Sequence, residues 1–264
     1  MGSDFILGYF KPILSGEDIK MTVSNEELHA FLKRVYQDAQ WSLSRADLNT
    51  HKDQLSTLTY GEIKESSVEQ ILSWLQLSSE DVVYDLGCGL GRFVAQIYLR
   101  SEAKAVFGIE LTESRYQQAR RMLDELRKIP NVHAARRIDI YQGDISEATC
   151  ADATVVYMCS TCFPNQLLNA IVDNLQRHAA VGLRLITLKR LPVPGRFHLL
   201  SQRDMEMTWS DSSTVYLYRL ELEPPEPEHR VLPDSESSLL ASEDDDWDSI
   251  DLDIDSFDWD SDDA

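Results

Sequence analysis

The sequence lacks a long hydrophobic run, and it contains little cysteine. No apolar stretch in its 264 residues approaches the roughly 20 residues that cross a bilayer, which excludes a membrane-spanning helix. Only Cys159 and Cys162 form a Cys-x-x-Cys pair, and without a second such pair they do not predict a zinc site. The N-terminal residues show no export signal. We therefore expect an intracellular protein, cytoplasmic or nuclear, with reduced thiols, no metal and no membrane association.

The sequence also lacks any excess of basic residues. Its net charge is −20, and residues 221–264 hold eighteen acidic residues against one arginine, so this end carries −17 and the rest only −3. A nearly neutral body and an acidic end give no electrostatic reason to expect nucleic-acid binding, whereas a basic partner fits. From residue 223 onward, proline and dense like charge predict a disordered acidic tail. This tail captures a basic partner, folds back on the domain as a regulator, or only keeps the chain in solution.

Hydrophobic periodicity predicts the architecture. Ser24 and Glu27 form a capping-box pattern ahead of a helix over 24–45, which we assign to an N-terminal segment, 1–59. Short β-branched runs then alternate with helical segments across 60–222, which predicts a doubly wound α/β domain with a mostly parallel, seven-stranded, Rossmann-like sheet. The last two strands, expected over 204–209 and 214–221, have no helix between them and predict an antiparallel hairpin at the sheet edge.

A glycine-rich turn follows the first predicted strand of this domain. Asp85 precedes Gly87, Gly89 and Gly91, and a helix is expected directly afterwards. Glycines let a ligand approach the backbone closely, and the helix N-terminus supplies unpaired N–H groups. The spacing differs from the dinucleotide fingerprint, and the preceding acid suits an ammonium group better than a pyrophosphate. The turn therefore predicts a binding site for S-adenosyl-L-methionine.

Two more acids follow the next two predicted strands. Glu110 ends the strand expected over 105–111, where a carboxylate can accept both ribose hydroxyls of a nucleoside. Asp144 follows the third strand, where it can accept the adenine amino group. Because the ends of parallel strands meet at one edge of a sheet, Asp85, Glu110 and Asp144 are expected to share one cofactor site.

Together with further motifs, these residues resemble those of known protein families. The glycine turn, Glu110 and Asp144 resemble the class I methyltransferases over 60–220. The Tyr60-Gly61-Glu62 sequence, the segment 155–163 and the segment 183–192 look like the catalytic core of the disruptor-of-telomeric-silencing family, the histone-lysine methyltransferases without a SET domain. This resemblance implies that Glu62 contacts the cofactor and that Ser160, Thr161 and Phe163 lie beside the transferred methyl group. It also implies a protein substrate. We expect its lysine to pass between Tyr60 and Phe163, with Ser160 as a polar contact to the amine or its water.

The chain departs from that family after the fourth strand, where Cys159-Ser160 replaces an asparagine pair. The same position lacks the Asn/Asp-Pro-Pro-Tyr/Phe motif of methyltransferases that act on planar amino groups. Three functions stay open: a methyltransferase for protein lysine, one for a small molecule or a non-lysine protein site, and a catalytically silent module that binds a basic partner.

Overall fold

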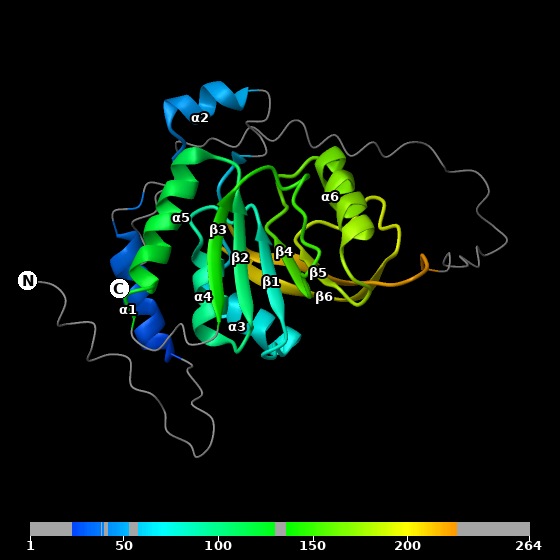
Figure 1. Ribbon diagram of the computed structural model, residues 1–264, viewed down its shortest axis with the longest axis horizontal. Helices are drawn as coiled ribbons and strands as arrows, with labels where there is room; N and C mark the ends of the chain where they lie inside the picture. The colour runs from blue at the N-terminus through cyan, green and yellow to red at the C-terminus, as the bar shows by residue number, and fades with distance from the viewer. Residues whose placement is uncertain (1–22, 38, 40–41, 53–57, 130–135, 226–264) are drawn as a thin grey trace, which may run out of the picture. The chain divides into compact units, whose positions relative to one another are not determined.

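A computed structural model describes residues 23–37, 39, 42–52, 58–129 and 136–225. Their strands form a seven-stranded sheet in the order β3-β2-β1-β4-β5-β7-β6 (Figure 1). The first five strands in this order are parallel to one another, β7 is antiparallel to β5, and β6 is antiparallel to β7. This confirms the predicted Rossmann-like α/β class and its antiparallel edge. The strands are β1 (Val82–Leu86), β2 (Ala105–Glu110), β3 (Arg137–Gln142), β4 (Val155–Met158), β5 (Arg184–Thr187), β6 (Phe197–Met207) and β7 (Ser210–Leu220).

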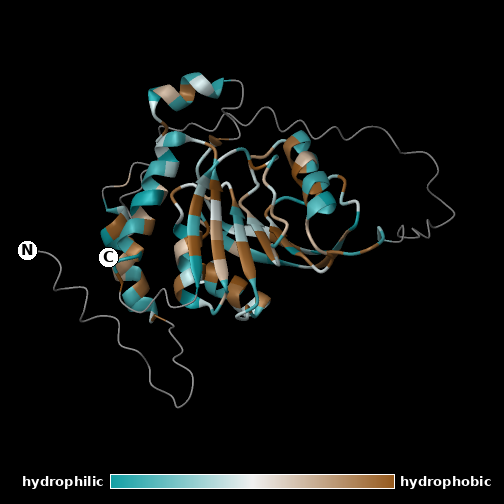
Figure 2. Ribbon diagram, in the orientation of Figure 1, coloured by the Kyte–Doolittle hydropathy of each residue, from teal (hydrophilic) through white to brown (hydrophobic). Residues whose placement is uncertain are grey.

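Helices pack on both faces of the sheet. Residues of α1, α3, α4 and α5 share one hydrophobic core with one face of the parallel strands, and α6 packs in a second core against the other face. Figure 2 shows that hydrophobic residues are concentrated in the parallel strands, as expected for strands that are buried on both sides. The helices in these cores are α1 (Asn25–Tyr36), α3 (Glu65–Leu75), α4 (Arg92–Arg100), α5 (Glu113–Leu126) and α6 (Asn165–His178).

The N-terminal helix is shorter than the sequence predicts. Its capping box between Ser24 and Glu27 is present, but α1 ends at Tyr36 rather than at residue 45. A second capping box, formed by Ser44 and Asp47, then starts the short helix α2 (Arg45–Thr50). Helix α2 therefore begins where the single helix predicted over 24–45 was expected to end. Because α1 shares its core with α4, it packs with the sheet domain.

The edge hairpin supports a segment that comes much earlier in the chain. Strand β6 begins at Phe197, before the predicted start, and pairs along its length with β7. Ile63 forms an isolated bridge with Met207, and the backbones of Glu62 and Thr208 are joined by a hydrogen bond of 2.8 Å. The hairpin therefore fixes the chain that enters α3.

The carboxyl ends of the five parallel strands meet at one edge of the sheet. Strand β1 lies between β2 and β4, so the chain order reverses beside β1, which is where ligands bind in open α/β sheets. The predicted acidic tail lies largely at 226–264, outside the described residues. Among the residues that the structure describes, no helix combines the length and apolar character needed to span a membrane.

Candidate active site

The glycine turn joins β1 to α4 and lies against the end of β2. Gly87, Gly89 and Gly91 all have positive φ angles, of 80°, 54° and 81°. The backbone amides of Gly87 and Cys88 donate to the carbonyl of Ile109 at 2.9 and 3.0 Å. At Gly89, an added Cβ would lie 2.6 Å from a ring carbon of Tyr60, so both the φ angle and the packing require glycine there. The turn is thus shaped by backbone contacts on one side and by an aromatic ring on the other.

Glu110 closes the same corner from the end of β2. Its side chain is buried, and one carboxylate oxygen accepts from the backbone amide of Gly89 at 3.0 Å. The other oxygen accepts from the amide and hydroxyl of Thr112, at 3.0 and 2.7 Å. A carboxylate offers about four acceptor positions, and three are used here. Glu110 therefore joins the glycine turn to α5 and still has an acceptor position for a ligand hydroxyl.

Asp85 is a buried carboxylate in β1 with an incomplete set of partners. It is 2% exposed, and its Oδ1 atom has no hydrogen-bond partner. Burial raises the pKa of Asp85 well above its usual value, and the negative charges of Glu110 and Glu62 raise it further. A buried acceptor without a partner costs free energy, so the fold leaves Asp85 in need of a cation.

Residues 58–62, which we call the 58–62 segment, lie over the glycine turn. The Tyr60 hydroxyl donates to the Glu62 carboxylate, and the other Glu62 oxygen lies 3.2 Å from Nε of Arg92 in an ion pair without hydrogen-bond geometry. Burial raises the pKa of Glu62, while Arg92, Tyr60 and Arg115 partly offset that effect. The structure thus brings Tyr60 and Glu62 to the predicted cofactor loop.

Ser160 follows β4 and has every hydrogen-bonding position of its hydroxyl in use. The residue is fully buried, its oxygen accepts from the amides of Leu188 and Lys189 at 3.1 Å each, and it lies 2.6 Å from the Thr187 hydroxyl. Thr187 itself donates to the Lys189 carbonyl, so Ser160 is the donor between the two hydroxyls. This arrangement ties the ends of β4 and β5 together, and contact between Ser160 and a substrate amine stays a prediction.

Phe163 and Thr161 occupy different surroundings in the same turn. Phe163 is buried, and its ring carbon would lie 3.3 Å from a Cβ placed on Gly87, so the ring packs against the glycine turn. Thr161 is exposed. The Cys159 thiol donates to the Gly61 carbonyl at 3.6 Å and so links this turn to the 58–62 segment. Phe163 is therefore the member of this turn placed beside the predicted cofactor loop.

Asp144 lies beyond the end of β3 and is exposed. Its Oδ1 atom accepts from the amide and hydroxyl of Ser146, at 2.8 and 2.7 Å, which forms a local turn. Its position past β3 agrees with the predicted edge of the sheet, and its contact with adenine stays a prediction.

The sequence analysis missed two arginines and two other residues that surround this site. Arg92 and Arg115 lie in the first turns of α4 and α5, and both direct their guanidinium groups toward the 58–62 segment. Tyr36 donates to the Leu90 carbonyl at 2.9 Å and lies under Arg92, while Asp47 caps α5. The sequence could have indicated the two arginines, because both fall in the first turn of a predicted helix. A cation there is repelled by the helix dipole and needs another partner.

The observed groups fit the cofactor that the sequence predicts. S-adenosyl-L-methionine carries an ammonium and a sulfonium charge, and the site contains a buried acid, Asp85, whose Oδ1 atom has no partner. Glu110 retains an acceptor position for a ribose hydroxyl. Asp85 would hold the ammonium group and Glu110 the ribose.

Comparisons with known proteins identify the family of this chain. A family model described as histone methylation protein DOT1 matches residues 39–220. An H3 lysine-79 specific histone-lysine N-methyltransferase of Caenorhabditis elegans is 28% identical over 55% of this chain, and the match covers 16% of that protein. A protein-lysine N-methyltransferase of Saccharolobus islandicus is 28% identical over 47% of this chain and 71% of its own length.

Among solved structures, an RNA methyltransferase from Salinibacter ruber, crystallised with S-adenosyl-L-homocysteine, is similar to this chain. The two are 24% identical with a TM-score of 0.48, and the match covers 62% of this chain and 96% of the other. The chain spans only a small part of the length of the worm relative, well under two thirds.

Proposed function

The chain belongs to the DOT1 histone methylation family and is an S-adenosylmethionine-dependent methyltransferase, and from this premise we propose that it methylates the ε-amine of lysine in a basic protein. The observation that carries the proposal is the buried, unpartnered Asp85 beside the glycine turn, covered by the 58–62 segment. Lysine as the acceptor is supported by two relatives whose names specify protein lysine.

The geometry suits a reaction in which positioning contributes more than acid–base chemistry. The cofactor supplies a methyl group on a sulfonium, which reacts with a nucleophile that approaches in line. In our proposal Asp85 and Glu110 fix the cofactor, and the rings of Tyr60 and Phe163, which both contact the glycine turn, form the walls of the acceptor channel. Apolar walls favour the neutral form of a lysine amine, which is the form with a free lone pair.

The acceptor is proposed to be basic because of the charge distribution along the chain. The acidic end at 221–264 carries −17, and such a charge accelerates encounter with a positively charged protein. Histones and other lysine-rich proteins have the required charge. The same property gives a small-molecule acceptor no advantage.

Transfer of labelled methyl groups tests the proposal. The protein is incubated with labelled S-adenosylmethionine and purified histones or a cell lysate, and modified bands are examined by mass spectrometry for ε-N-methyllysine. Asp85→Asn is the inactive variant, and Asp173→Asn, an exposed aspartate on α6, is the matched control. Label on lysine that depends on Asp85 and survives Asp173→Asn supports the proposal. Label confined to small molecules or to another side chain contradicts it.

A further inference from the structure

Arg115 lies in a place that helix electrostatics disfavour. It belongs to the first turn of α5, where the positive end of the helix dipole repels a cation, and it is only 6% exposed. Burial of a guanidinium adds a desolvation cost. The fold tolerates both costs, so the contacts of Arg115 must offset them.

Two of those contacts join Arg115 to the 58–62 segment. One Arg115 nitrogen donates to the Leu58 carbonyl at 2.8 Å, and the guanidinium carbon lies 4.9 Å from the centre of the Tyr60 ring. A guanidinium at this distance over an aromatic face forms a cation–π contact, which strengthens when it is shielded from water. Arg115 therefore holds the segment at two points, by its backbone and by its aromatic side chain.

The base of Arg115 is itself fixed. Asp47 of α2 accepts from the backbone amides of Glu113 and Ser114, at 3.0 and 3.3 Å, and so caps α5 immediately before Arg115. The hydrogen bonds of Ser114 and Ser44, opposed by burial, lower the pKa of Asp47, so it stays ionised as a cap. Helix α5 is thereby anchored while its first arginine reaches the segment.

The position of the Tyr60 ring depends on these contacts. The edge of the ring lies against Gly89, where an added Cβ would lie 2.6 Å from one ring carbon and 3.5 Å from the two next to it, and the Tyr60 hydroxyl donates to Glu62. A ring with its edge against the glycine turn and Arg115 over it places the hydroxyl that donates to the Glu62 carboxylate.

We propose that Arg115 is a positioning residue for S-adenosylmethionine, which acts by holding the Tyr60 ring and the 58–62 segment over the glycine turn. The inference rests on the proposed role of Tyr60 and Glu62 at the cofactor. It assigns Arg115 no direct contact with the acceptor, and the quantity that tests it is the affinity for the cofactor.

The test is calorimetric binding of S-adenosylmethionine and S-adenosylhomocysteine to the full chain. Arg115→Gln is expected to weaken both ligands about 10- to 30-fold, since it removes a shielded cation–π contact and a charged hydrogen bond. Arg115→Lys keeps the charge but not the planar stacking and should recover part of that loss. Arg121→Gln, an exposed arginine on the same helix, should bind both ligands like the wild type. In turnover assays Arg115→Gln should raise KM for the cofactor.

A double-mutant cycle separates positioning from a general structural role. Tyr60→Leu removes the ring face, and if Arg115 acts through that ring, the double variant Arg115→Gln/Tyr60→Leu should bind no more weakly than the weaker single variant. If Arg115→Gln fails to fold, the cycle is run with Arg115→Lys.

Each other outcome has a defined meaning. If Arg115→Gln is folded and binds both ligands like the wild type, or if the losses are fully additive, the inference is overturned. If Tyr60→Leu alone leaves the affinity unchanged, the proposed role of the segment fails first. Because binding is measured directly, neither result depends on finding the methyl acceptor.

Discussion

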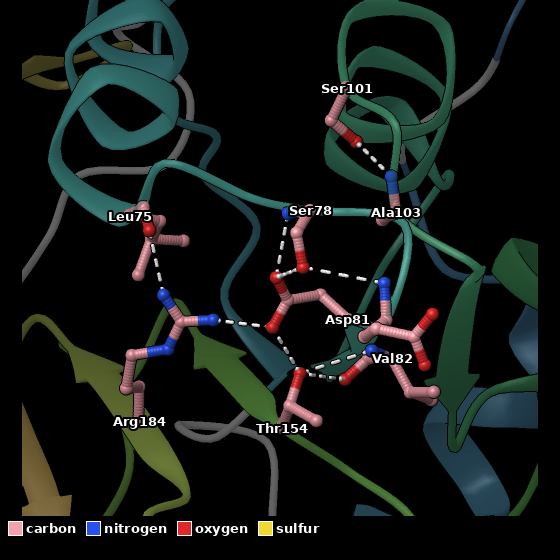
Figure 3. A network of polar contacts seen from close by, with 9 residues as sticks. Leu75, Ser78, Asp81, Val82, Ser101, Ala103, Thr154 and Arg184 are labelled. Carbon is pink, nitrogen blue, oxygen red and sulfur yellow. Dashed lines mark hydrogen bonds and ion pairs between the residues drawn. The ribbon is translucent and has the colours of Figure 1, made fainter.

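Two aspartates lie at opposite ends of strand β1 and have opposite surroundings. Asp81, just before the strand, accepts from the amide and hydroxyl of Ser78, at 2.7 and 3.0 Å, from the Thr154 hydroxyl at 2.7 Å and from Arg184 at 2.5 Å (Figure 3). Asp85, near the end of the strand, has an oxygen with no partner.

As a result, the pKa values of the two carboxyl groups are shifted in opposite directions. Burial alone would raise the pKa of Asp81, but hydrogen bonds from Ser78 and Thr154 and the charge of Arg184 lower it overall. Burial raises the pKa of Asp85, and the neighbouring acids Glu110 and Glu62 add to that effect. At the amino-terminal edge of the sheet the Asp81 carboxylate therefore has protein partners and stabilises the fold. At the carboxyl-terminal edge the Asp85 carboxylate has an oxygen without a partner, which a ligand can use.

Asp85→Asn should produce the largest change in function. The variant loses the charge that we assign to the cofactor ammonium group, so affinity for S-adenosylmethionine should fall about 10- to 100-fold, the worth of a charge-assisted hydrogen bond. Its free energy of unfolding at pH 7 should stay the same or rise, because a buried carboxylate is removed. Calorimetry and urea unfolding measure both quantities, and unchanged affinity would remove Asp85 from the site.

Asp81→Asn should lower the stability of the protein and leave its affinity for the cofactor unchanged. The variant leaves the half-buried Arg184 without its anionic partner, so the free energy of unfolding should fall by about 2–3 kcal/mol. Affinity for the cofactor should be unchanged, because the Asp81 network lies at the other end of the strand. A loss of cofactor affinity with intact stability would break the comparison between the two edges.

Gly89→Ala should separate the close approach of Tyr60 from backbone strain. Gly182→Ala is a matched control, because Gly182 also has a positive φ angle, of 94°, but a Cβ added there would meet nothing within 4 Å. Both variants should lose about 1–2 kcal/mol of stability from left-handed backbone strain. Only Gly89→Ala should also raise KM for the cofactor, on the order of tenfold, and equal kinetic effects in the two variants would contradict the packing of Tyr60 on the turn.

The pH dependence of stability should show the smallest but most diagnostic difference. The lowered pKa of Asp81 means that its contribution is present above the ordinary aspartate pKa and is lost as the pH falls through the lowered value. Asp85 has the opposite sign, since its contribution is greatest below the ordinary pKa and is lost as the pH rises through the raised one. In urea unfolding between pH 5 and 8, the free energy of unfolding of the wild type should therefore fall as the pH rises. This fall should be smaller in Asp85→Asn and unchanged in Asp81→Asn.

Much of the fold followed from local patterns. Alternation of β-branched runs with amphipathic helices predicted the parallel sheet, and the capping box at Ser24 predicted the start of α1. The end of α1 at Tyr36 was missed, because the apolar positions beyond it suggested a longer helix while a second cap at Ser44 starts a new one. Ends of helices depend on such competing caps more than on periodicity.

The site was predictable where the chemistry lies at strand ends. Asp85, Glu110 and the glycines could be identified because strand topology alone carries them to one edge. The cover of that edge could not be predicted in the same way. Arg115 reaches Leu58 and Tyr60 across a large separation in sequence, and the saturated hydrogen bonds of Ser160 depend on the neighbouring strand β5. Such contacts arise from tertiary packing, which a local pattern does not record.

Proton release on cofactor binding tests the central claim most directly. Binding is measured by calorimetry at pH 6 in buffers of different ionisation enthalpy, where the cofactor's own amine is almost fully protonated. Burial raises the pKa of Asp85 in the free protein, and a bound ammonium group favours its ionised form, so the wild type should release more protons on binding than Asp85→Asn does. Equal proton release in the two proteins would contradict the assignment of the incomplete edge of β1 to the cofactor.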